Sequence, residues 1–160
     1  MRERASMVTL HPMTDAEFDE YMRVLRVSYA QERAESANTS LEEEQAESDR
    51  QLNQLLPDGL RSPGHFFWNV VDEASGSAAG TLWVFEDATK HRAFIYGIEM
   101  RADQRGKGYG TAALAALEET LRSRGVTRIA LNVFGKNTGA QRLYARVGYY
   151  PIAIAMQKDL

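Results

Sequence analysis

One stretch of this sequence constrains the fold more than any other: a strand-like run that breaks into glycines and then opens a helix. Residues 98–110 read Ile-Glu-Met-Arg-Ala-Asp-Gln-Arg-Gly-Lys-Gly-Tyr-Gly, and a helix-forming run follows over residues 111–124. A second strand-like run occupies residues 127–134. Because a helix crosses between them, the two strands must run parallel. The segment therefore predicts a β–α–β crossover within an α/β sheet.

The same turn has the chemistry of an anion site. Its glycines permit positive φ and close backbone approach, and the helix start offers unpaired N–H groups. Arg105 and Lys107 add two full charges. The spacing does not fit a P-loop, and a dinucleotide fingerprint would need glycine where Thr111 stands. The pattern present is Arg-x-x-Gly-x-Gly, formed by Arg105, Gly108 and Gly110.

Composition limits the chemistry and the cell compartment. The chain has 160 residues, 44% of them hydrophobic and 26% charged, as is usual for one globular domain. It has no cysteine, which excludes disulfides and cysteine nucleophiles, and its three scattered histidines show no metal-ligand spacing. No apolar run approaches the roughly 20 residues of a membrane helix. No apolar core follows the basic start at residues 1–6, so we expect no signal peptide and a cytoplasmic protein.

Charge is distributed unevenly, although the formal net charge is only −3. Residues 15–58 hold twelve acids and four arginines, whereas residues 101–146 hold nine bases and three acids. The basic half suits a polyanionic ligand. The acidic half favours a cationic one, although a solvated helix face explains the same residues. Nucleic acid is disfavoured as a partner, because the basic residues surround the turn already interpreted as an anion site.

Local patterns predict the remaining elements. Thr14 or Asp15 can cap a first helix, and Ser40 with Glu43 forms a capping-box pattern for a second helix that reaches Leu56. A short helix is expected over residues 138–147. The predicted strands cover residues 7–13, 65–71, 79–85, 92–100, 128–134 and 149–158. These elements predict a single α/β domain with a mixed, strongly twisted sheet.

The sequence after the crossover indicates which kind of anion site this is. It reads Asn137-Thr-Gly-Ala140-Gln-Arg-Leu143-Tyr144-Ala-Arg-Val-Gly148-Tyr149. Together with the Arg-x-x-Gly-x-Gly turn, in this order and spacing, it resembles the GNAT superfamily of acyl-CoA-dependent N-acyltransferases. The match is specific over residues 93–150 and looser before them. Residues 94–99, 131–137 and 156–160 also resemble a subgroup of poorly characterised bacterial members.

The resemblance implies a GNAT-like fold, with about six to seven strands flanked by about four helices. It also implies a single N-acetyltransferase domain over residues 1–160. Residues 1–92 would form the acceptor-side half, and residues 93–160 would bind acetyl-CoA, the acyl donor. No metal is expected. The family favours a homodimer, although no sequence element identifies an interface.

The resemblance assigns the turn to the CoA pyrophosphate. Main-chain N–H groups would bind the phosphates, assisted by Arg105 and Lys107. In the family, the strand carrying residues 98–100 has a bulge whose free backbone groups pair with the pantetheine arm and can steady the oxyanion. Asn137 can cap its helix and also bind the cofactor. The implied cofactor-binding residues are Ile98, Met100, Gln104, Arg105, Gly106, Lys107, Gly108, Tyr109, Gly110, Thr111, Asn137 and Tyr144.

Two side chains are candidates for catalysis. Tyr144 matches the family tyrosine that protonates the departing thiolate, although a half-buried helix tyrosine bonded to a backbone carbonyl would look the same. Glu99 is the first choice of base, because it lies on the strand where the thioester should sit. Some members place the base five residues earlier, where this chain has Phe94. A salt-bridged Glu99, with a water wire taking the proton, is the alternative.

The acceptor should lie against the first two helices and the second and third strands of the meander. Plausible lining residues are Tyr29, Glu32, Trp83 and Tyr96. The acidic N-terminal half favours a small cationic amine attacking directly in a ternary complex. A peptide amine, meaning a protein N-terminus or lysine, stays open as an acceptor, and so does a longer acyl group. A CoA-binding sensor without turnover is the alternative from another functional class.

Overall fold

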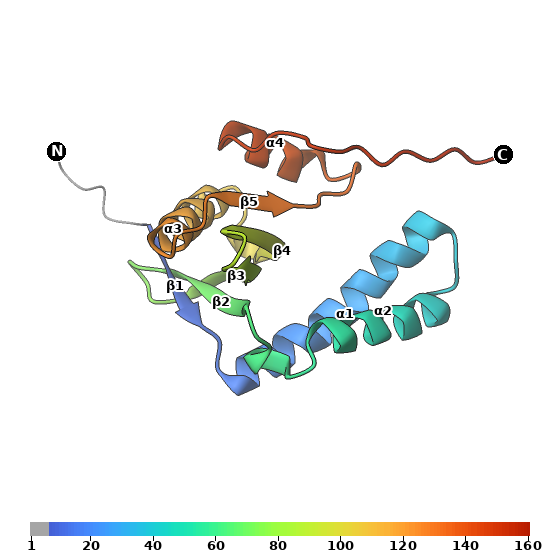
Figure 1. The fold of residues 1–160 in the computed structure, drawn as a ribbon, viewed down its shortest axis with the longest axis horizontal. Coiled ribbons are helices and arrows are strands. Elements are labelled where there is room, and N and C mark those ends of the chain that lie inside the picture. The colour runs from blue at the N-terminus through green and yellow to red at the C-terminus, as the bar shows by residue number, and fades with distance from the viewer. Residues whose placement is uncertain (1–6) are drawn as a thin grey trace.

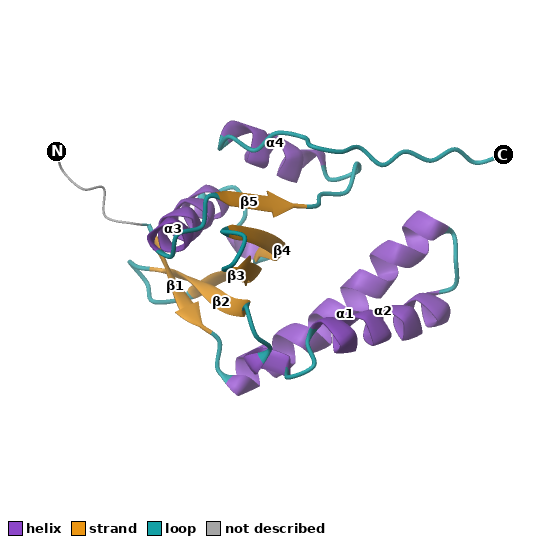
Figure 2. Ribbon diagram, viewed as in Figure 1, coloured by secondary structure: helices purple, strands orange, loops and turns teal. Residues whose placement is uncertain are grey.

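The sheet of the computed structural model follows the strand pattern of the sequence (Figures 1 and 2), and the structure describes residues 7–160. Its strands lie in the order β1-β2-β3-β4-β5. The first four are antiparallel, and β5 is parallel to β4, as the crossover requires. Their bounds are β1 Val8–Pro12, β2 His65–Asp72, β3 Ala78–Asp87, β4 Arg92–Met100 and β5 Arg128–Leu131.

Four α-helices and two short 3-10 helices complete the described chain. The bounds are α1 Asp15–Ala37, α2 Leu41–Leu55, η1 Gly59–Arg61, η2 Ala102–Gln104, α3 Tyr109–Ser123 and α4 Thr138–Arg146. Thr14 and Glu17 form a reciprocal capping box on α1, and the Ser40 hydroxyl accepts from the Glu43 N–H on α2. None of these helices is long and apolar enough to cross a membrane. The N-terminal residues 1–6, considered above for a signal peptide, lie outside the described residues.

Helices cover both faces of the sheet (Figure 2), and the alternation of strand side chains divides the core in two. On β3, Leu82 and Val84 face a cluster built with Leu114, Leu117 and other apolar residues of α3. Trp83, between them, faces the opposite cluster, which is closed by α1 and α2. The α1–α2 hairpin and the start of α3 therefore meet the sheet from opposite sides.

Strand β4 stays paired with β3 to its end at Met100, but it leaves β5 near its middle. It pairs with β5 only through Arg92–Ile95. On its other side, Ile95 pairs with Val84 and Gly97 with Trp83, so Tyr96 is an extra residue and forms a bulge. The family resemblance predicted the bulge at residues 98–100. It lies slightly earlier, at Tyr96. At the bulge, Gly97 leaves room for the Tyr21 hydroxyl, which would lie 2.9 Å from a Cβ at that position.

The prediction of a final strand over residues 149–158 is wrong. The described chain has no strand beyond Leu131, and from Tyr150 onward its residues are exposed. In Figure 1 this segment runs from α4 out to the C-terminus as an extended trace. The apolar alternation is present, but a strand also needs a hydrogen-bonded neighbour, and residues 7–160 supply none. The sheet therefore has five strands in the described chain, slightly fewer than predicted.

Candidate functional site

The N-terminus of α3 is open. Thr14, Ser40 and Asn137 cap the other three α-helices with side-chain oxygens, whereas the N-cap of α3 is Gly108, which has no side chain to do so. The first hydrogen bond of this helix runs from the Ala112 N–H to the Gly108 carbonyl at 3.1 Å. The N–H groups just before Ala112 therefore have no acceptor within the helix, and they carry the positive end of its dipole.

The turn before α3 needs its glycines. Gly106 and Gly108 have φ values of 74° and 87°, which side chains rarely tolerate. A Cβ at either position would meet no heavy atom within 4 Å, so a side chain there would be disfavoured by its backbone conformation and not by a clash. The exposed turn and the unpaired N–H groups at the start of α3 together suit an anion.

Two cations border this turn through long, loose contacts. The Arg105 guanidinium donates to the Met100 carbonyl at 3.3 Å and lies 3.5 Å from a Glu99 carboxylate oxygen. The Lys107 ammonium donates to Gln104 Oε1 at 3.3 Å. Arg105, Lys107 and Glu99 are exposed. Both cations can therefore turn toward an incoming anion at little energetic cost.

The second half of β4 lies directly before this turn. Ile98 and Met100 pack against the α3 side of the core, so Glu99 between them points to the opposite face of the sheet. Beyond Ile95, β4 has no partner in the described ladder on its β5 side. An extended polar chain can add to that edge as a strand would. The edge ends at the open N-terminus of α3.

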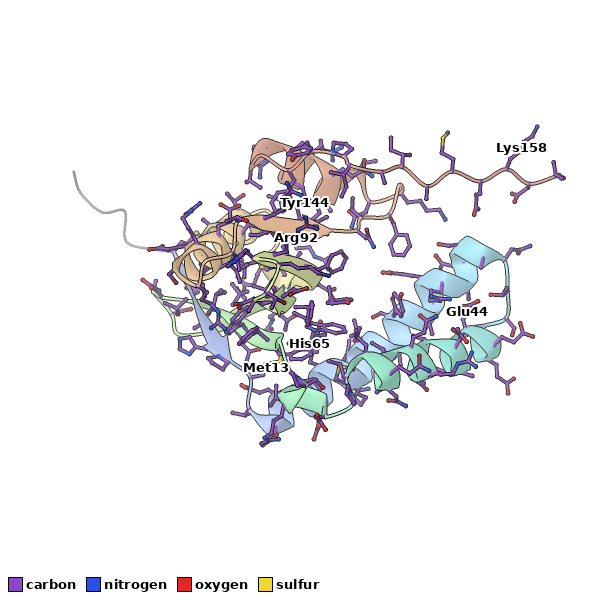
Figure 3. All side chains as sticks on the ribbon, viewed as in Figure 1. Met13, Glu44, His65, Arg92, Tyr144 and Lys158 are labelled. Atoms are coloured by element: carbon purple, nitrogen blue, oxygen red, sulfur yellow. The ribbon has the colours of Figure 1, made fainter. Side chains whose placement is uncertain are left out.

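Helix α4 brings Tyr144 toward the sheet from the far side of β5 (Figure 3). Its ring lies 5.7 Å from that of Tyr149, and burial raises the pKa of its hydroxyl. Among the described residues we find no hydrogen-bond partner for this hydroxyl, so the bond to a backbone carbonyl considered above does not form. A neutral phenol with a free O–H can donate a proton outward.

Three other predicted cofactor residues use their side chains within the protein. Asn137 Oδ1 accepts from the Ala140 N–H at 3.1 Å, which is the expected helix cap. Thr111 Oγ1 accepts from Arg146 at 3.1 Å and ties α3 to α4. The Tyr109 side chain packs into the core, and burial together with the charge of Asp72 raises its pKa. Tyr109 therefore offers the open turn its backbone rather than its ring.

On the opposite face, α1 brings carboxylates close to β4. Partial burial of the Glu32 carboxyl raises its pKa, and the negative charges of Glu99 and Glu35 raise it further. Burial and the charge of Glu99 also raise the pKa of Tyr21 on α1. The structure thus brings Glu32 and Glu99 together in one acidic region. The Tyr21 contact had no sequence signal, because it depends on how α1 crosses β4.

Aromatic rings form a surface beside these carboxylates. Tyr96 is 40% exposed and stacks on Trp83 at 4.6 Å between centroids. Trp83 is 3% exposed and donates from Nε1 to His65 Nδ1 at 3.0 Å, so it supports Tyr96 from below rather than lining a site. Burial lowers the pKa of His65. The Tyr29 ring lies 5.7 Å from the Arg33 guanidinium, and no ring contact joins it to Tyr96 among the described residues.

The arrangement can hold a phosphorylated thioester and an amine on two sides of β4. The open turn and the free β4 edge suit the former, while Tyr96, Glu99 and Glu32 suit a cation. In residues 7–160, no three or more histidine, aspartate or glutamate side chains gather as a metal site.

Comparison with known proteins agrees with this geometry. The model of the acetyltransferase (GNAT) family matches residues 21–149. The uncharacterized N-acetyltransferase YycN of Bacillus subtilis strain 168 is 33% identical over 156 residues, covering 96% of this chain and 99% of its own. YdgE of the same strain, also an uncharacterized N-acetyltransferase, is 33% identical over 154 residues, covering 95% and 98%. The crystal structure of YycN, a putative acetyltransferase, superimposes with a TM-score of 0.88 at 34% identity, covering 96% of this chain and 98% of that one.

Proposed function

This chain belongs to the acetyltransferase (GNAT) family, and we propose that it transfers an acetyl group from acetyl-CoA to a small cationic primary amine. The observation that carries the proposal is the meeting of the uncapped N-terminus of α3 with the unpaired edge of β4. A pyrophosphate binds at the first and a pantetheine arm along the second. Residues 1–160 then act as one catalytic domain, with the donor on the α3 side and the acceptor on the α1 side.

Acetyl transfer proceeds in one ternary complex, because the chain has no cysteine and no evident Ser/His/Asp order to support an acyl-enzyme. The amine nitrogen attacks the thioester carbonyl carbon, the N–C bond forms and the C–S bond breaks. Backbone N–H groups near Ile98 and Met100 stabilise the oxyanion, an interaction commonly worth about 3 kcal/mol. The Tyr144 hydroxyl gives its proton to the departing thiolate.

The acceptor must lose a proton to react. For an amine with a pKa near 10.4, deprotonation at pH 7 costs about 4–5 kcal/mol. Glu99 takes this proton, directly or through a water. Arg105, at 3.5 Å from Glu99, moves to the donor phosphates when CoA binds, which frees the carboxylate. Glu32 and the exposed Tyr96 then hold the cationic part of the acceptor.

The first test is a thiol-release screen with acetyl-CoA against polyamines, aminoglycosides, amino acids and N-terminal peptides, run beside a calorimetric titration with CoA. Turnover with a small cationic amine is expected. Turnover with peptides alone would overturn the acceptor class and retain the chemistry. CoA binding without turnover of any amine would favour a sensor, and absence of CoA binding would overturn the whole proposal.

Arg105→Glu tests the donor site directly. We expect this charge reversal to weaken CoA binding at least tenfold, because it places a negative charge beside the phosphates. Arg122→Glu is the matched control, since it makes the same charge reversal in the exposed last turn of α3, about 20 Å from the N-terminus of that helix. Equal CoA affinities for the two variants would contradict the assignment of the turn.

A further inference from the structure

The ring of Tyr21 fixes the place of its hydroxyl on the α1 face of the sheet. The ring packs against the core cluster that contains Phe67 and Trp83, and it meets the Phe67 ring edge-on, with 5.9 Å between centroids. Phe67, Trp83 and Gly97 pair in one row across β2, β3 and β4. The Tyr21 ring lies over the Phe67 end of this row, and its hydroxyl reaches the Gly97 end.

The bulge of β4 makes room for this hydroxyl. It turns two consecutive residues to the α1 face: Tyr96, which stacks on Trp83, and Gly97. A Cβ on Gly97 would lie 2.9 Å from the Tyr21 oxygen, so this oxygen takes the space that a side chain at position 97 would fill. Residues 7–160 give the oxygen no hydrogen-bond partner, and they do not enclose it. Tyr21 therefore presents an unpaired hydroxyl at the bulge.

Glu99 shares this face with the Tyr21 hydroxyl. Positions 97 and 99 lie two residues apart along β4, which is about 7 Å at the usual strand rise. Two hydrogen bonds through one water span about 5.5 Å, and the Glu99 side chain can close the difference. Burial and the negative charge of Glu99 raise the pKa of Tyr21, so the phenol stays neutral. A neutral phenol at this distance serves as a hydrogen-bonding group and not as a base.

We propose that Tyr21 is a positioning residue, whose hydroxyl holds the water through which the acceptor passes its proton to Glu99. This role rests on the proposed acetyl transfer and adds one residue to its acceptor side. The bulge is the point at which β4, beyond Ile95, has left β5, so the water lies beside the place proposed for the thioester. The position of the hydroxyl thus matches the position of the reacting amine.

The water makes three hydrogen bonds. Its oxygen accepts from the acceptor ammonium, one of its hydrogens goes to the Glu99 carboxylate and the other to the Tyr21 oxygen. The ammonium proton passes to the water as the water's own proton passes to Glu99. The nitrogen is left as a neutral amine, which can attack the carbonyl carbon of the thioester.

Tyr21→Phe tests this role, because it removes the hydroxyl and keeps the ring that packs on Phe67. With a small amine of ordinary basicity at pH 7, kcat should fall about tenfold, the effect of one lost hydrogen bond. The KM for acetyl-CoA and the calorimetric affinity for CoA should not change. With a weakly basic analogue of the same amine, the deficit should shrink to about twofold or less, because that amine is already largely neutral at pH 7.

Tyr150→Phe is the matched control, since it removes the hydroxyl of a tyrosine that is 74% exposed and lies outside the site. Its rates should equal those of the native chain with both amines. Gly97→Ala tests the position of the hydroxyl independently, because its Cβ would displace the Tyr21 oxygen. It should lower kcat as Tyr21→Phe does, and the two changes together should cost little more than either alone.

The outcomes separate this role from the proposed function. If the native chain turns over the amine and Tyr21→Phe does so equally well, Tyr21 is excluded and acetyl transfer stands. A deficit of the same size with both amines, or additive losses in the double variant, would likewise exclude the proton path through Tyr21. If the native chain turns over no amine, the proposed function fails and this role fails with it.

Discussion

Tyr144 and Tyr149 hold two hydroxyls in contrasting surroundings on either side of the end of α4. Both are half-buried, and their rings are 5.7 Å apart. The Tyr149 hydroxyl is buried with no hydrogen-bond partner among the described residues, whereas the Tyr144 hydroxyl is unpaired but not enclosed. The Tyr144 hydroxyl can therefore act on a ligand, whereas the Tyr149 hydroxyl only lowers the stability of the fold.

For Tyr144→Phe we expect kcat to fall by about 10²–10⁴, the usual contribution of a general acid, while CoA affinity stays unchanged. Because burial raises the pKa of Tyr144, native activity should decline at alkaline pH only as pH rises through that raised pKa. Steady-state rates across pH, with calorimetric CoA titration, check both points. Undiminished turnover by the variant would remove Tyr144 from the mechanism.

Tyr149→Phe should raise the free energy of unfolding at pH 7 by about 1 kcal/mol, because it removes an unsatisfied buried hydroxyl. Burial, aided by the charges of Glu118 and Tyr144, raises the pKa of Tyr149 from 10.0 to about 12. The native protein should therefore lose stability between these two pH values, since the unfolded chain ionises first. Denaturant unfolding at neutral and alkaline pH measures this loss, which should be smaller in the variant. An equal loss would exclude Tyr149 as its source.

At the scale of elements, the start of α3 differs from the starts of the other helices. Thr14, Ser40 and Asn137 each accept a hydrogen bond from a backbone N–H of their own helix. Gly108 has no side chain to do so and leaves the first N–H groups of α3 unpaired. The three caps could be predicted from sequence because each acts over three residues. The bulge of β4 was expected at residues 98–100 but lies at Tyr96, because its position depends on pairing with β3.

Gly108→Ala should weaken CoA binding about tenfold, because alanine resists the φ of 87° that opens the turn. Gly76→Ala is the matched control. Gly76 also has a positive φ, 70°, and a Cβ there would likewise meet nothing within 4 Å, but it lies in the β2–β3 turn. Both variants should lose similar thermal stability, and only the first should lose CoA affinity in calorimetry. A matching loss of affinity in both would indicate a global effect.

At the scale of the whole molecule, the proposed acceptor side forms where α1 meets β4. Glu32→Gln should raise KM for the cationic amine roughly fivefold, the effect of about 1 kcal/mol expected for a partly exposed ion pair. The KM for acetyl-CoA should not change. Glu119→Gln is the control, because it removes the same charge from an exposed position on α3, across the sheet. Equal amine KM values in the two variants would exclude Glu32 from acceptor binding.

The pH dependence of amine binding follows from the same contact. Only the ionised Glu32 attracts a cation, and its pKa lies above the usual glutamate value because of burial and the charges of Glu99 and Glu35. The KM for the amine should therefore begin to rise, as pH falls, at a higher pH than for an ordinary exposed glutamate. In Glu32→Gln this rise should disappear.

The sequence by itself determined the family, the order of helices and strands as far as residue 147, the parallel crossover and the open glycine turn. These depend on caps, on positive-φ positions and on connection rules that act within a few dozen residues. Only the tertiary structure decided that Glu32 approaches Glu99, that Trp83 supports Tyr96 from below, and that residues 149–158 find no strand beside them. Each of these depends on which faces and edges meet across long sequence separations, and alternation along one segment does not specify its neighbour.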